Sequence, residues 1–221
     1  MKALVFDFDG LIVDTESLWF DVYKEVLVEY DCELKLEDFA LSIGTKDDVL
    51  YERLTKIARK PINRIEIDRK THERYQQQMS QLHLREGVNE YLKAAKELGL
   101  KIGLASSSSR NWVQGFLEKF NIKEFFEVVK TSDNVKKVKP DPELYLQAIQ
   151  ELGVKPYEAL AFEDSKNGLI AATKAGLHCV IVPNSVTSFL DFSGHLHRLS
   201  SMEEIELKDL LHLIESKLVK E

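Results

Sequence analysis

Beyond residue 83, helical and strand patterns alternate along the chain. Runs with apolar residues on one helical face are each followed by a short, nearly continuous apolar run, and glycines end several of the helices. The pattern predicts strands at 3–9, 101–105, 125–132, 158–164 and 179–184, and helices at 89–98, 110–120, 141–152, 165–175 and 203–218. Strands separated by single helices form right-handed βαβ units, so we expect a parallel sheet covered on both faces.

Residues 15–82 break this rhythm. They contain three helical runs, at 16–30, 46–59 and 64–82, and no convincing strand. We therefore predict an α/β protein with a Rossmann-like parallel sheet core formed by residues 1–14 and 83–221. Residues 15–82 are predicted to form an inserted α-helical cap domain.

Composition and charge exclude several classes of protein. The 221 residues are 44% hydrophobic and 30% charged, as in soluble globular proteins. A net charge of −7 argues against a sequence-independent nucleic-acid binder, and no apolar run is long enough to cross a membrane. The chain starts without a signal-peptide pattern, and Cys32 and Cys179 lack metal or redox spacing. These features predict a cytoplasmic protein with free thiols, and no protein partner is indicated.

Side chains of complementary chemistry follow the predicted strands. Parallel strands end at one edge of a sheet, and ligands bind in the crevice outside those ends. Each such residue alone is typical of a solvated turn, a helix cap or a surface charge run, but the set together indicates a site. The set comprises Asp7 and Asp9 after the first strand, Ser106 to Ser109 after the second, Lys136, Lys137 and Lys139 before Pro140, and Glu163 and Asp164 after a later strand.

The acids of this set need compensation. Four ionised carboxylates carry about −4, and two unit charges about 4 Å apart interact by roughly 4 kcal/mol at an effective dielectric of about 20. Either a divalent cation binds or some of the acids stay protonated. Because the ligands are all oxygens, with no paired histidine or cysteine, the pattern favours Mg²⁺ over zinc.

Four short stretches resemble the four motifs of the haloacid dehalogenase-like superfamily in order and spacing. They are "DFDGLIVDT" from residue 7, the first serine of "LASSSS", the lysine of "KPDP" and "FEDS" from residue 162. The helical insertion after the first motif resembles the cap of the subfamily that contains β-phosphoglucomutase and phosphoglycolate phosphatase. The resemblance spans the whole chain.

The resemblance implies a role for each matching residue. Asp7 would be the nucleophile that forms an aspartyl-phosphate, and Asp9 the acid that protonates the leaving alkoxide and then activates water. Ser106 would hydrogen-bond the transferring phosphoryl group, and Lys139 would offset its charge. The metal ligands would be Asp7, Asp9 through its main-chain carbonyl, Asp164 and, directly or through water, Glu163.

Further residues are candidate substrate contacts. In the cap loop "SIGTKDDVL", the alternatives are recognition of a sugar or a distal phosphate, and a simple helix junction with a solvated lysine. Arg110 is either a contact for an anionic substrate or a surface residue at a helix start. The candidate substrate-binding residues are Gly10, Thr15, Gly44, Lys46, Ser106, Ser107, Ser108 and Arg110.

These residues predict a Mg²⁺-dependent phosphatase that hydrolyses a small phosphorylated metabolite, most plausibly a sugar phosphate. The enzymatic alternative is a hexose-phosphate mutase of the β-phosphoglucomutase type. That enzyme has a histidine on its first cap helix and an arginine in its cap loop. Here Trp19 or a neighbour and Lys46 take those places, which favours hydrolysis. A third hypothesis, a phosphorylation-dependent binding module of the response-regulator kind, is opposed by the length of the chain and by its insertion.

Overall fold

A six-stranded parallel sheet organises the core. The computed structural model describes residues 1–43 and 47–219. The strands lie in the order β3-β2-β1-β4-β5-β6, and every pair is parallel. This arrangement confirms the α/β, Rossmann-like fold. The strands are β1 (Ala3–Phe6), β2 (Lys101–Ala105), β3 (Val128–Lys130), β4 (Ala159–Glu163), β5 (His178–Ile181) and β6 (His197–Arg198).

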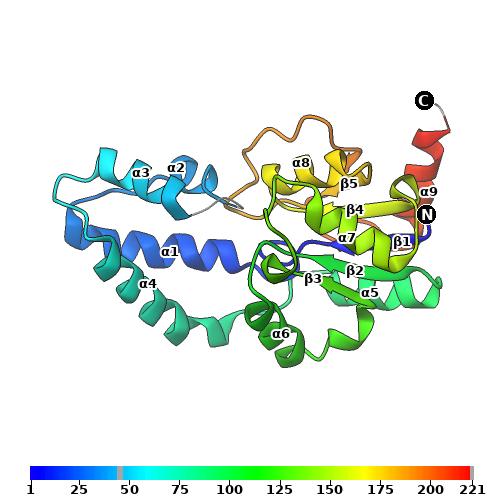
Figure 1. Ribbon diagram of the computed structural model, residues 1–221, viewed down its shortest axis with the longest axis horizontal. Coiled ribbons are helices and arrows are strands. Elements are labelled where there is room, and N and C mark those ends of the chain that lie inside the picture. Colours follow the sequence, from blue (N-terminus) through cyan, green and yellow to red (C-terminus); the bar gives the residue numbers. More distant parts are fainter. Residues whose placement is uncertain (44–46, 220–221) are drawn as a thin grey trace.

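Helices cover both faces of this sheet (Figure 1). Because side chains alternate along a strand, Leu4 and Phe6 of β1 face one helical layer, and Ala3 and Val5 face the other. The first layer contains α5 (Val88–Glu97), α6 (Arg110–Lys119) and α9 (Leu207–Leu218). The second contains α7 (Glu143–Leu152) and α8 (Lys166–Lys174). The central strands β1 and β4 are buried throughout, as expected in a sheet covered on both sides.

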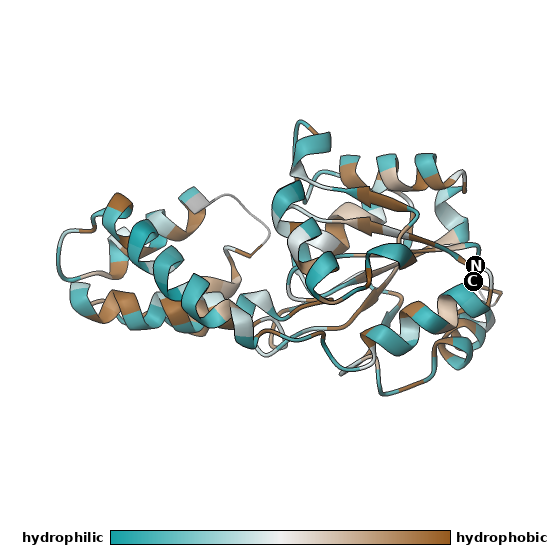
Figure 2. Cartoon of the chain, turned by 90° about the horizontal axis from the view of Figure 1, so that it is seen from below, coloured by the Kyte–Doolittle hydropathy of each residue, from teal (hydrophilic) through white to brown (hydrophobic). Residues whose placement is uncertain are grey.

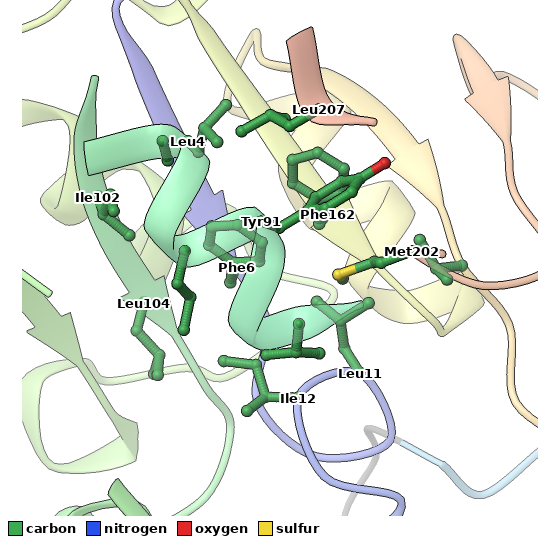
Figure 3. Close-up of a cluster of buried hydrophobic side chains, with 14 of the residues drawn as sticks. Leu4, Phe6, Leu11, Ile12, Tyr91, Ile102, Leu104, Phe162, Met202 and Leu207 are labelled. Atoms are coloured by element: carbon green, nitrogen blue, oxygen red, sulfur yellow. The ribbon is translucent and has the colours of Figure 1, made fainter. Parts of the chain in front are cut away.

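The first of the two cores is built on aromatic rings (Figure 3). Phe6 of β1 stacks on Phe162 of β4 with ring centroids 4.9 Å apart, and Tyr91 of α5 meets Phe162 edge-on at 5.7 Å. All three side chains are buried. The hydroxyl of Tyr91 donates to the carbonyl of Ile205 at 2.8 Å, which satisfies its only polar group.

Residues 15–82 form what we call the helical insert. It contains α1 (Thr15–Leu27), α2 (Leu36–Ala40), α3 (Asp47–Ile57) and α4 (Arg64–Gln78), and no strand lies in its described residues. Asp14 caps α1 by accepting from the amide of Ser17. The insert has an apolar cluster of its own, to which the core contributes Val186. In Figure 1, α1 and α4 run side by side along the length of the insert.

Hydrogen bonds join the insert to the core at several points. The side-chain amide of Asn167, on α8, donates to the carbonyl of Ile43 at 2.8 Å. The hydroxyls of Ser17 and Ser185 lie 2.7 Å apart.

The amino terminus is held against the last helix of the core. The α-amino group of Met1 pairs with Glu215 of α9 at 3.0 Å.

The structure departs from the predicted elements at several places. The short helix α2 lies between the first two predicted helical runs, the predicted strand 125–132 is reduced to β3, and the predicted helix 203–218 begins only at Leu207. The first strand ends at Phe6, three residues early, because the chain turns at Gly10 and Gly10 donates back to Val13. The short strand β6 was not predicted, since two polar residues, His197 and Arg198, carry no strand periodicity. Short 3₁₀ turns complete the fold at Val28–Tyr30, Met79–Gln81, Lys123–Phe125, Ser132–Asn134 and Pro156–Glu158.

Hydropathy follows this architecture. In Figure 2 brown segments concentrate on the strands inside the core, and the helices show teal on their outer sides. Among the described helices, each is too short or too polar to traverse a bilayer.

We expect Phe162→Ala to lower the free energy of unfolding by roughly 3–5 kcal/mol, because it leaves a cavity against both Phe6 and Tyr91. Leu146→Ala, at a position of α7 that is 43% exposed, is the matched control and should change it by less than about 1 kcal/mol. Urea denaturation followed by circular dichroism measures both. If both variants lose the same free energy of unfolding, Phe162 is not at the centre of the core as described.

Candidate active site

The turn after β1 sets the position of the two acids. Phe8 between them is fully buried in the core. Gly10 has φ +79°, and a Cβ there would lie 2.2 Å from Oδ2 of Asp164. Only glycine fits this backbone conformation and this close approach. Asp7 and Asp9 are thereby held at the carboxyl ends of β1 and β4, where the strand order reverses direction.

Lys139 joins the acids of two strands. Its ammonium group donates to Asp7 of the first turn and, at 2.7 Å, to Glu163 at the end of β4. Tyr145 of α7 donates its hydroxyl to the same Glu163 oxygen at 2.5 Å. Lys139, Asp7 and Glu163 are all buried. The lysine predicted from "KPDP" therefore lies at the centre of the acid group.

Burial and mutual repulsion govern the ionisation of this group. Burial, followed by the charge of Glu163, raises the pKa of Asp7 to about 7, against the opposing effect of Lys139. Burial likewise raises the pKa of Asp164 well above its ordinary value, helped by Asp7 and Glu163. Burial alone would lower the pKa of Lys139, but the charges of Asp7 and Glu163 and their hydrogen bonds raise it. The single positive charge of Lys139 therefore does not balance the negative charges of all the neighbouring acids.

Three of the acids could hold a metal ion. Ligand oxygens of Asp7, Glu163 and Asp164 lie within 4.8 Å of one another. Oδ2 of Asp164 accepts from Asn184 at 2.8 Å, whereas its buried Oδ1 has no hydrogen-bond partner in the described part of the chain. A buried carboxylate oxygen without a donor, in an all-oxygen group, fits Mg²⁺. The side chain of Asp9 is not part of this group.

Asp9 is surrounded by hydrogen-bond donors instead. Its Oδ2 accepts from Ser108 at 2.7 Å and from Ser106 at 3.2 Å. Its Oδ1 accepts from the indole Nε1 of Trp112 at 2.8 Å and from Thr15 at 3.1 Å. The hydroxyls expected to contact substrate thus orient the second acid in this structure. Trp112 was missed because it has the spacing of an ordinary apolar helix residue on α6.

The other candidate substrate contacts lie in different surroundings. The hydroxyl of Ser107 is buried and has no hydrogen-bond partner among the described residues, so it can bind a phosphoryl oxygen. Arg110 is exposed at the start of α6, and its main-chain amide donates to Asp133. Gly44 and Lys46 lie outside the described residues.

A cavity of about 410 Å³ lies between the insert and the core. Its size is in the lower part of the usual range for small-molecule sites, roughly 300–1,000 Å³. Residues of both parts line it. They are Asp7, Asp9, Ser107, Ser108, Lys139, Asp164 and Ser165 from the core, and Glu16, Trp19, Tyr23, Phe39, Ser42, Ile43, Leu50, Asp68 and His72 from the insert.

Glu16 is a further acid that the sequence pattern did not single out. An acid in the first turn of a helix is ordinary, because it complements the helix dipole. Here, however, Glu16 faces the cavity. Burial, followed by the charges of Asp9 and Asp7, raises its pKa to about 8. The raised pKa favours the uncharged carboxylic acid, and in that form Glu16 can both donate and accept a hydrogen bond.

Known proteins resemble this chain over nearly all its length. A Bacillus subtilis protein named "Putative phosphatase YhcW" is 49% identical over 98% of this chain and 99% of the relative. Hexitol phosphatase B of Escherichia coli is 32% identical over 95% and 96%. A solved structure of mutant CbbY from Rhodobacter sphaeroides with xylulose 1,5-bisphosphate superposes with a TM-score of 0.76, at 29% identity, over 92% of this chain and 96% of that one.

The family model described as haloacid dehalogenase-like hydrolase matches residues 4–182. That range contains every core residue that lines the cavity, from Asp7 to Ser165. The sequence motifs, the parallel sheet and this match agree, and the chain belongs to the haloacid dehalogenase-like hydrolases.

Proposed function

We propose that this protein is a Mg²⁺-dependent phosphatase that hydrolyses the phosphate monoester of a small metabolite, a sugar phosphate, through an aspartyl-phosphate on Asp7. Residues 15–82 serve as the cap domain over a core of residues 1–14 and 83–221. The observation that carries the proposal is the buried carboxylate of Asp7, which lines the cavity beside the ammonium group of Lys139. The names of the relatives, a hexitol phosphatase among them, point to the same class of substrate.

The reaction has two steps. A carboxylate oxygen of Asp7 attacks phosphorus. The bond between phosphorus and the substrate's bridging oxygen breaks as Asp9, which enters this step protonated, gives that oxygen its proton. Water then attacks the phosphorus of the aspartyl-phosphate and gives a proton to Asp9. Inorganic phosphate leaves, and both aspartates return to their starting states.

Electrostatics lower the barrier of both steps. Lys139 bonds Asp7 in the resting site and lies where the phosphoryl oxygens must arrive. The unpartnered hydroxyl of Ser107 can donate to one of those oxygens. A Mg²⁺ ion held by Asp7, the main-chain carbonyl of Asp9 and Asp164, with Glu163 directly or through water, would supply further positive charge against the phosphoryl group.

The acid–base residue must be held toward the leaving oxygen. Four donors fix the carboxyl group of Asp9 at the cavity edge, and they come from three separate segments: Thr15 from α1, Ser106 and Ser108 from the turn after β2, and Trp112 from α6. Such positioning contributes to the rate because a proton can move only over hydrogen-bond distance.

The products distinguish hydrolysis from the mutase alternative. The enzyme is incubated with β-glucose 1-phosphate and a trace of glucose 1,6-bisphosphate. Accumulation of free phosphate supports the phosphatase, and accumulation of glucose 6-phosphate would replace it with a mutase.

We expect Asp7→Asn to reduce phosphate release by at least about a thousandfold, because it removes the nucleophile. Circular dichroism should show the wild-type fold, since the change keeps the shape of the side chain. Asp191→Asn, at an exposed acid far along the sequence, is the matched control and should retain full activity. Wild-type turnover by Asp7→Asn would refute the proposed nucleophile.

We expect Trp112→Phe to lower kcat about tenfold on a sugar phosphate but less than about twofold on p-nitrophenyl phosphate. The sugar alkoxide needs a proton from a well-placed Asp9, whereas p-nitrophenolate leaves without one. Asp9→Asn should show the same substrate dependence with a larger loss. If Trp112→Phe lowers kcat equally on both substrates, the indole stabilises the fold and does not position Asp9.

A further inference from the structure

The two walls of the cavity differ in chemistry. The core wall carries the acids, serines and lysine that act on a phosphoryl group. The wall formed by the insert carries a largely apolar surface with a few polar groups set into it. Because the phosphoryl end of a substrate must lie at Asp7, the rest of the substrate must extend toward this second wall.

An aromatic ring of fixed orientation forms part of the insert wall. Trp19 stacks on Tyr75, with ring centroids 4.0 Å apart and planes 19° from parallel. His72 meets the same indole edge-on at 5.3 Å. Tyr75 is buried, so it holds the indole from behind. An aromatic surface of this kind packs against the C–H groups of a carbon chain without offering charge.

A carboxylate is set into the same wall. Oδ1 of Asp68, on α4, accepts from the hydroxyl of Tyr51 at 2.6 Å. Its Oδ2 lies 3.6 Å from Nε of Arg64, which also pairs with Asp48 at 2.5 Å. Arg64 is shared between the two carboxylates, so it compensates for only part of the charge of Asp68. Asp68 lines the cavity, whereas Arg64 and Asp48 do not.

The neighbouring imidazole offers another acceptor. Nδ1 of His72 lies 2.7 Å from the main-chain carbonyl oxygen of Asp68. A carbonyl oxygen only accepts, so Nδ1 carries the proton, and Nε2 is the nitrogen left to accept from a ligand when the ring is uncharged. His72 also lines the cavity. Acceptors of this kind are matched by hydroxyl groups, each of which can donate.

Cations are scarce around this space. Among the described residues that line the cavity, Lys139 is the single lysine or arginine, and it is engaged by Asp7 and Glu163 at the phosphoryl end. The described insert wall therefore offers a second phosphate or a carboxylate no lysine or arginine, and the carboxylate of Asp68 repels it. A hydroxyl-bearing, uncharged chain meets no such repulsion.

We infer that the insert wall selects monophosphates whose carbon chain is an uncharged polyol or sugar, with Asp68 excluding substrates that carry a second anionic group. This inference rests on the proposed phosphatase function. Trp19 packs against the carbon chain, and Asp68 and His72 accept from its hydroxyls. The residues of the insert thus decide which ester reaches Asp7.

Two substrates that differ in one group test the inference. Glucitol 6-phosphate and gluconate 6-phosphate share the carbon chain and the phosphate position, but the far end is a hydroxymethyl group in one and a carboxylate in the other. We expect the wild-type kcat/KM to favour glucitol 6-phosphate by at least about tenfold. We expect Asp68→Asn to narrow this preference by at least about threefold, because the amide still accepts from Tyr51 but carries no charge. Asp48→Asn, the other carboxylate on Arg64, is the matched control and should keep the wild-type ratio.

p-Nitrophenyl phosphate, as a third substrate, distinguishes failure of the proposed phosphatase function from failure of the inferred selectivity. Phosphate release from none of the three substrates would overturn the proposed function itself. If p-nitrophenyl phosphate is hydrolysed but the two sugar-derived esters are used equally or not at all, the inference alone is overturned. The inference is also overturned if folded Asp68→Asn keeps the wild-type ratio of kcat/KM for the two esters. Comparison of fructose 6-phosphate with fructose 1,6-bisphosphate needs no variant: a preference for the bisphosphate would also overturn it.

Discussion

The site depends on how several carboxylates are held in one buried place. Asp7, Glu163 and Asp164 lie within reach of one another at the sheet edge, and a single ammonium group, that of Lys139, is bonded to two of them. Buried charges of like sign are costly unless they are paired. Gly168 shows how tightly the acids are packed, since a Cβ there would lie about 1.9 Å from the carboxylate of Glu163.

Two aspartates that are two residues apart in sequence are given different surroundings. Asp7 is buried beside Lys139 and other acids, whereas Asp9 accepts from three hydroxyls and an indole. Separate environments allow one carboxyl group to act as a nucleophile and the other to exchange protons. The arrangement requires segments from across the chain, because Thr15 belongs to the insert and Trp112 to the core.

The sequence alone predicted the parallel sheet, the helical character of residues 15–82 and the acid group at the strand ends. Those features follow from periodicity and from the rule that parallel strands end at one edge. It did not reveal Glu16, Asp68, His72 or Trp112. Each lies on a helix at a position where a surface acid, a surface histidine or an apolar residue is ordinary. Only the packing of α1, α4 and α6 around the cavity gives them neighbours. Gly44 and Lys46 fall outside the described residues, so their predicted contacts stay predictions.

If a divalent cation stabilises the buried acids, it must also stabilise the folded protein, and the melting temperature measures this effect. An ion that binds only the folded state raises the melting temperature by mass action. We predict that Mg²⁺ at millimolar concentration raises that of the wild type by several degrees, as expected for a ligand well above its Kd. Asp164→Asn should lose this rise and, without metal, melt no lower than the wild type, because one repelling charge is gone. Identical melting of the wild type with Mg²⁺ and with EDTA would contradict the account.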